Sequence, residues 1–251
     1  GEPMTLGQRL RLVVYLSVPA IIAQLSSIVM QYIDASMVGS LGAEASASIG
    51  LVSTTTWLFG GLCSAASTGF TVQVAHRIGA GDMQGARAVL RQSFTAIVIW
   101  GLAVSVLGMS ISTYLPYWLG GDVAIRHDAS LYFFIFSLFL PALQLSFLAS
   151  GMLRCSGNMH VASLLGVSMC VLDVLLNFFL IFPTRCLSVG GYDVHILGAG
   201  LGVGGAALGT VVAESLVAAV MLWYLWYRSP ELSLAKNKGC FRPKLVTIRK
   251  A

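Results

Sequence analysis

Residues 12–40, LVVYLSVPAIIAQLSSIVMQYIDASMVGS, decide how this chain can fold. The 22 residues from position 12 to position 33 carry no charge, and a helix that spans a bilayer needs about 20 apolar residues. Pro19 cannot donate a backbone hydrogen bond, so we expect the helix to bend there. Asp34 places a carboxylate in the membrane at a cost of about 2.5 to 3.5 kcal/mol, which makes it a candidate functional residue.

The composition of the chain is that of an α-helical membrane protein. Of its 251 residues 57% are hydrophobic and 10% are charged, whereas soluble domains carry about 25% charged residues. The long uncharged runs do not alternate polar and apolar residues, which excludes a membrane β-barrel. We therefore expect an all-α membrane protein whose surroundings are membrane lipid.

The net charge of +5 does not indicate a nucleic-acid partner. Seven of the 15 Lys and Arg residues fall in the last 24 positions, where they suit a cytoplasmic anchor beside lipid head groups. The five cysteines have neither metal-site nor redox spacing, and their number is odd, so no disulfide framework is expected. No cleavable signal peptide is expected either, because the first apolar run is too long and lacks an Ala-x-Ala site.

The uncharged runs predict six membrane-spanning helices. Their expected ranges are 10–38, 46–75, 87–115, 129–153, 160–182 and 203–227. The predicted organisation is a cytoplasmic segment at 1–9, a six-helix bundle at 10–228 and a basic cytoplasmic tail or linker at 229–251.

The distribution of basic residues predicts the orientation of these spans. With the N-terminus in the cytoplasm, cytoplasmic segments hold 13 of the Lys and Arg residues, and outside loops hold only Arg126 and Arg185. A missed or additional span would destroy this asymmetry. We therefore expect a multi-pass protein of the cell inner membrane with both ends of this chain in the cytoplasm.

Three carboxylates lie within the predicted spans, at Asp34, Asp173 and Glu214. No Lys, Arg or His lies deep in a span, so this chain offers these carboxylates no ion pair. An uncompensated carboxylate in a membrane must be protonated, bind a cation or face water. The pattern therefore predicts a site for protons or other cations.

The depths of the polar residues suggest that they meet. At about 1.5 Å per residue, Asp34 lies roughly 9 Å and Asn177 roughly 10 Å below the outer ends of their spans, and Thr210 lies at a similar depth. Asp173 is one helical turn from Asn177, and Glu214 is one turn from Thr210. We expect these five side chains to line one polar pocket in the outer half of the bundle.

Each of these residues also has a purely structural interpretation. A threonine such as Thr210 often bonds to its own helix backbone, and Asn177 can join neighbouring helices. Glu214 can face a part of the protein outside this chain. Gln24, Gln31 and Gln144 fit packing as well as they fit a cavity wall, and we include Gln24, Gln144 and Glu214 as possible additional pocket residues.

Several segments, taken in order, resemble the multidrug and toxic compound extrusion (MATE) family. Pro19 precedes Asp34 by fifteen residues, and the exit of the first span reads MVGSLGAEASASIG. The later segments are GAGD after the second span, LRCSGN after the fourth, LDVLLNFFLIFP in the fifth and GVGGAALGT opening the sixth. The resemblance covers essentially residues 10–228.

The resemblance implies a fold and an activity. MATE proteins are secondary active exporters (antiporters) of small organic cations and drugs, driven by proton or sodium gradients. They have twelve helices in two six-helix lobes around a central cleft. By this resemblance the chain is the N-terminal lobe of a multidrug efflux transporter, and its partner is a missing C-terminal lobe.

The family also implies a set of site residues. Its N-lobe cation site uses an aspartate on the first helix, a polar pair on the fifth and a threonine on the sixth. These positions correspond to Asp34, Asp173 with Asn177, and Thr210, and the family assigns a bend to the proline at Pro19. Many relatives have Asn first and Asp four residues later on the fifth helix, so this chain reverses the pair, and Glu214 is outside the family set.

Three other functions remain as alternatives. A lipid-linked oligosaccharide flippase of the same superfamily would be expected to line its cavity with basic residues, which the spans lack. An intramembrane enzyme is not expected, because the chain contains no Asp-Asp-x-x-Asp, His-Glu-x-x-His or Gly-x-Ser-x-Gly motif. A structural subunit or channel would leave Asp34 and Asp173 unexplained. No cofactor is expected other than sodium or a proton as the coupling ion.

Overall fold

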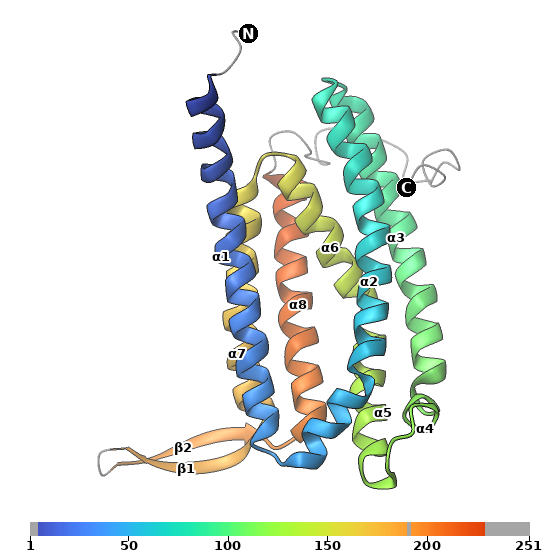
Figure 1. Cartoon of the computed structure of the whole chain (residues 1–251), viewed down its shortest axis with the longest axis vertical. Helices are drawn as coiled ribbons and strands as arrows, with labels where there is room; N and C mark the ends of the chain where they lie inside the picture. The colour runs from blue at the N-terminus through green and yellow to red at the C-terminus, as the bar shows by residue number, and fades with distance from the viewer. Residues whose placement is uncertain (1–4, 190–191, 229–251) are drawn as a thin grey trace.

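The computed structural model describes residues 5–189 and 192–228, which form a bundle of helices with a β-hairpin at one end (Figure 1). The predicted tail at 229–251 therefore lies outside the described residues, as do most of the last basic residues. The elements in chain order are α1 (Leu6–Gly39), α2 (Ala43–Gly79), α3 (Met83–Ser112), α4 (Leu115–Trp118), α5 (Val123–Leu138), α6 (Leu140–Cys155), α7 (Met159–Ile181), β1 (Pro183–Val189), β2 (Tyr192–Ala199) and α8 (Gly202–Tyr227).

The described chain contains the six predicted spans, one of which is broken. Helices α1, α2, α3, α7 and α8 are each long and apolar enough to cross a membrane. Helices α5 and α6 together form the sixth span and are bent by 50° where they meet. The single helix expected at 129–153 is therefore two helices, and the first of them begins earlier, at Val123. Pro141 lies in the first turn of α6, where its missing N–H and its ring prevent α5 from continuing.

The two ends of the bundle differ in their connections. One end, here called the N-terminal end, holds the start of α1, the α2–α3 and α6–α7 turns and the end of α8 (Figure 1). The opposite hairpin end holds the α1–α2 turn, α4 and the β-hairpin. The two interhelical turns at the N-terminal end share their chemistry. Gly81 (φ +76°) precedes Asp82, and Gly157 (φ +80°) precedes Asn158, the residues that begin α3 and α7.

The long connection between α7 and α8 forms the antiparallel hairpin β1–β2, which was not predicted from the sequence. Pro183 pairs with Ala199 and Val189 pairs with Tyr192, with a shift in register near Arg185. Five residues of the hairpin, Thr184, Val189, Tyr192, Val194 and Ile196, are of types that favour strands. The prediction of an all-α membrane bundle is confirmed, and this hairpin is an addition to it outside the spans.

Helix α1 leaves space inside the bundle. It packs mainly against α7 and has few contacts with α2, whereas α2 packs against α3, α5 and α6. Figure 1 shows α1 and α2 diverging from their shared turn toward the N-terminal end. The outward side of α1 exposes apolar side chains such as Val13, Ile21 and Leu25, which suits contact with lipid. Two cavities have walls from both α1 and α2, and Asp34, Thr210 and Glu214 line them.

Candidate functional site

A single amide joins two carboxylates at the contact between α1 and α7. Asn177 Nδ2 donates to Asp34 Oδ1 at 2.9 Å and to Asp173 Oδ2 at 3.3 Å. Asp173 and Asn177 are completely buried, and Asp34 is partly exposed. Asn177 of α7 therefore contacts Asp34 of α1 through its side-chain amide. The same amide contacts the carboxylate of Asp173, one turn away on α7.

Two oxygen atoms in this cluster lack a donor. Asp173 Oδ1 and Asn177 Oδ1 are buried and accept no hydrogen bond from the described residues. Such an atom costs about 1 to 3 kcal/mol when it stays unsatisfied, and two neighbouring carboxylates repel each other. Hard cations bind carboxylate and amide oxygens, so the donor set fits a small cation. A proton shared by the carboxylates would relieve the same repulsion.

Helix α8 closes the cluster from the third side. The Thr210 side chain lies beside Asp173, and its hydroxyl donates to its own helix at Ala206 O, 3.2 Å away. Its oxygen remains available as an acceptor. Gly209 allows this approach, because a Cβ at that position would collide with the Asn177 side chain. Asp34, Asp173, Asn177 and Thr210 are thus gathered in one place.

Asp34, Asn177 and Thr210 also line a cavity of about 530 Å³, here called the Asp34 cavity. Its walls come from α1, α2, α5, α7 and α8, and Gln31 and Tyr132 are among its lining residues. Asp173 is not among the residues that line it, and it contacts lining residues through Asn177, Asp34 and Thr210. Tyr132 was not identified from the sequence. Which residues of α5 face the cavity depends on the bend between α5 and α6, and that bend was not predicted.

Glu214 does not join this cluster, contrary to the single pocket expected from the sequence. It lines a second cavity of about 530 Å³, here called the Glu214 cavity, together with Gln24. Four residues along a helix advance about 6 Å, so Glu214 lies closer to the N-terminal end than Thr210 does. The residues that line the two cavities do not overlap.

The Glu214 cavity has a hydroxyl-rich wall that was not predicted from the sequence. Its α2 side is formed by Ser64, Ser67, Thr68 and Thr71. Their spacing of three and four residues places them on one face of a helix, so the signal was present in the sequence.

Gln144 lines neither cavity, which corrects its interpretation as a possible pocket residue. It is completely buried, and its Nε2 donates to Cys63 O at 2.9 Å and to Ser67 Oγ at 3.1 Å. These bonds join α6 to α2. Gln144 is therefore a residue of helix–helix packing.

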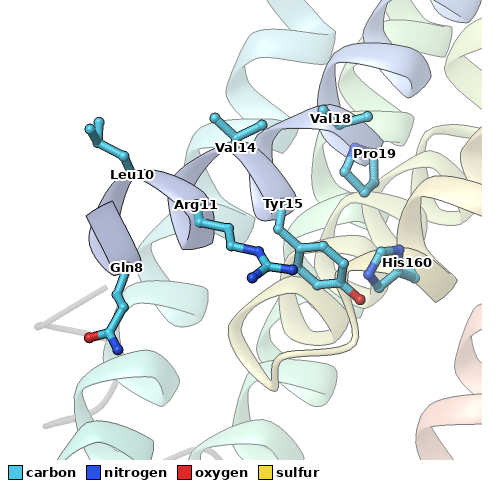
Figure 2. Close-up of a pocket in the computed structure, with 8 residues that line it drawn as sticks. All are labelled: Gln8, Leu10, Arg11, Val14, Tyr15, Val18, Pro19 and His160. Carbon is cyan, nitrogen blue, oxygen red and sulfur yellow. The ribbon is translucent and has the colours of Figure 1, made fainter. Parts of the chain in front are cut away.

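Pro19 lies in α1, which continues through it as one helix. Its side chain borders a surface groove of about 840 Å³ at the N-terminal end of the bundle. Figure 2 shows Pro19 next to Tyr15 and His160, whose rings meet edge to face with centroids 5.1 Å apart. Arg11 lies on the same side of α1. A helix bend at Pro19 stays a prediction.

Comparison with known proteins agrees with this architecture. A family model described as MatE matches residues 19–179, more than half of the chain. The chain is 24% identical over 229 residues to the probable multidrug resistance protein NorM of Thermotoga maritima (strain ATCC 43589 / DSM 3109 / JCM 10099 / NBRC 100826 / MSB8). That alignment covers 91% of this chain and 46% of NorM.

Two solved structures have the same fold in one part of their chains. A MOP superfamily transporter from Pyrococcus furiosus Vc1 (DSM3638) superposes with a TM-score of 0.78 at 22% identity, over 95% of this chain and 49% of that chain. A MATE structure in complex with MaD3S superposes with a TM-score of 0.80 at 21% identity, over 94% and 50%. The chain thus spans about half the length of these relatives and has the fold of one lobe. It belongs to the MatE family of multidrug and toxic compound extrusion transporters.

Proposed function

We propose that this chain is the N-terminal lobe of a secondary active exporter of organic cations that is coupled to a proton or sodium gradient. The observation that carries the proposal is the Asp34–Asn177–Asp173 cluster, in which one amide holds two carboxylates and two buried oxygens have no donor. The relative named as a probable multidrug resistance protein supports the assignment to drug export.

The coupling cation acts in this proposal by linking α1 to α7. The cluster contains one carboxylate from each helix, so an ion or a proton bound there favours the state in which the two helices are in contact. A ligand shifts a conformational equilibrium only by its differential affinity for the two states. In the cation-bound state α1 contacts α7 and bends at Pro19. Export follows if this state and the cation-free state differ in their affinity for the substrate.

The partner and the membrane orientation are part of the proposal. A C-terminal lobe supplies the second wall of the central cleft. The basic residues of the described chain support a cytoplasmic N-terminal end in the cell inner membrane. At that end lie Arg11, Arg77, Arg87, Arg91, Arg154 and Arg228.

The charge of the cavities favours cationic cargo over the anionic cargo of a lipid-linked oligosaccharide flippase. Neither an Arg nor a Lys is among the residues found to line the Asp34 cavity. Arg154 is the basic residue found on the wall of the Glu214 cavity, and its side chain is exposed.

The test is ethidium efflux from cells that produce the full-length protein with Asp34→Asn. We expect loss of efflux at an unchanged amount of protein in the membrane, because the amide cannot hold a coupling cation in place of the carboxylate. Asp122→Asn is the matched control, since Asp122 is an exposed residue at the hairpin end and lines neither cavity. Unchanged efflux by Asp34→Asn would remove this residue from the mechanism.

A further inference from the structure

Glu214 is a carboxylate inside a membrane span that the coupling site does not use. It lies in α8, one turn from Thr210, and its side chain is partly exposed to the Glu214 cavity. It forms no salt bridge with any residue of the described chain. Ser146 of α6 lies within hydrogen-bonding range of its carboxylate. The carboxyl group therefore faces a cavity and has no ion-pair partner among the described residues.

Three hydroxyls on the α2 side of this cavity direct their protons to the backbone. Thr68 Oγ1 donates to Ser64 O at 2.8 Å, and Thr71 Oγ1 donates to Ser67 O at 2.9 Å. Ser67 Oγ donates toward Gln144 O at 3.4 Å. Because these protons are directed to the backbone, the hydroxyl oxygens have lone pairs left for a ligand. Such a wall suits a ligand that donates hydrogen bonds or carries positive charge.

The size and the remaining lining of the cavity indicate what kind of cation fits. A volume of about 530 Å³ lies within the range of about 300 to 1,000 Å³ typical of sites for drug-sized molecules. The described residues contain no group of three or more His, Cys, Asp or Glu side chains that could hold a metal ion. Phe147, Met169 and Met221 add aromatic and polarizable surface, which suits the body of an organic cation.

We propose that the Glu214 cavity binds the positively charged group of an organic amine or quaternary ammonium compound, with Glu214 as its counter-ion. This inference rests on the proposed export function. It assigns the binding of the positively charged group of the cargo to Glu214, a residue separate from the coupling site. Thr210 faces the Asp34 cavity and Glu214 faces the other, so α8 lines both sites. Arg154 also lines this cavity, and its side chain is exposed.

The test measures equilibrium binding of ethidium and of phenanthridine, its uncharged parent ring system, to the purified full-length protein. Glu214→Gln keeps the shape of the side chain and removes its charge. We expect it to weaken ethidium binding about tenfold or more and to change phenanthridine binding less than about twofold, because only ethidium carries a positive charge. Glu214→Asp should restore part of the affinity for ethidium.

Two further variants locate the bound cation. Glu44→Gln is the matched control, because Glu44 is exposed in the first turn of α2 and lines neither cavity. Asp34→Asn should retain ethidium binding although it abolishes export. Equal ethidium affinity of Glu214→Gln and the unaltered protein would overturn the inference and leave the proposed function intact. The inference would also be overturned if Asp34→Asn lost ethidium binding while Glu214→Gln kept it. Failure of the unaltered protein to bind ethidium would contradict both.

Discussion

The Asp34 cavity and the Glu214 cavity have the same volume and different chemistry. Each is about 530 Å³, and α1, α2, α7 and α8 contribute to both walls. In the first, a carboxylate is tied through an amide to a second, buried carboxylate. In the second, a single carboxylate lies among hydroxyls. Two carboxylates around one amide concentrate oxygen ligands on a small ion, whereas one carboxylate in a roomy polar cavity suits a larger ligand of single charge.

The two regions also differ in how firmly their carboxylates are held. Asp173 and Asn177 are completely buried between α7 and α8, where Gly209 brings the backbones close. Glu214 has no ion-pair partner in the described chain and is partly exposed. Substitutions in the first region should therefore act mainly on the coupling cation, and substitutions in the second should act on cargo.

The largest effect is expected from Asp173→Asn. This change keeps the shape of the cluster and removes its buried carboxyl group, so coupling-cation affinity should fall about 100-fold or more. Ethidium binding should stay within about twofold of the unaltered protein, since Asp173 lines neither cavity. Both affinities can be measured on one preparation of the full-length protein. A parallel fall in ethidium affinity would show that the two cavities are not separate sites.

A smaller effect on the same side of the comparison is expected from Gly209→Ala. The added Cβ collides with the Asn177 side chain, so the amide must move away from Asp34. We expect about a tenfold loss of coupling-cation affinity, because misplaced supporting groups typically cost 10- to 100-fold at an ion site. Gly60→Ala is the control, since a Cβ there meets no atom within 4 Å. Unchanged affinity in Gly209→Ala would mean that the orientation of Asn177 is not essential.

Gln144→Leu should lower stability and leave the Asp34 cluster unchanged, because neither Gln144 nor its partner Ser67 lines the Asp34 cavity. Loss of the bonds to Cys63 O and Ser67 Oγ should lower the free energy of unfolding by about 1 kcal/mol. The unfolding midpoint in detergent should fall, and export normalised to the folded protein should stay the same. Gln84→Leu, an exposed position on α3, serves as the control. A specific loss of cation binding in Gln144→Leu would place this residue in a functional site after all.

The smallest effect is expected from Arg77→Gln. Arg77 pairs with Asp82 at 2.8 Å, but the two side chains are 46% and 49% exposed. Exposed ion pairs contribute about 0 to 1 kcal/mol, so the midpoint of unfolding should hardly move. Both binding affinities should match those of the unaltered protein. A change in either affinity would mean that the α2–α3 turn communicates with the cavities.

The sequence predicted the spans well because each depends on a local property. The lengths of the uncharged runs predicted the ends of five helices to within a few residues of the observed ends. These helices are α1, α2, α3, α7 and α8. The bend between α5 and α6 was not predicted, although Pro141 lies at it. Hydropathy indicates which residues form a span, but it does not indicate whether the helix axis changes direction within the span. The β1–β2 hairpin was missed because its pairing depends on contacts between two strands rather than on either segment alone.

The candidate site was predicted in part for the same reason. Counting residues from the span ends placed Asp34 and Asn177 at one depth, and the structure brings these side chains into contact. The same count assigned Glu214 to that pocket, but depth alone does not say which residues line a cavity. The divergence of α1 from α2 and the bend of the broken span shape two cavities, and both features arise from packing between helices.

The most direct test of the account is isothermal titration of the purified full-length protein with sodium. It should be run at several pH values and in two buffers of different ionisation enthalpy, so that proton exchange is detected as well. The account predicts a saturable sodium signal or a buffer-dependent proton signal that is lost in Asp34→Asn and kept in Glu214→Gln. A signal that survives Asp34→Asn, or that both variants remove equally, would contradict a coupling site at Asp34 separate from the Glu214 cavity.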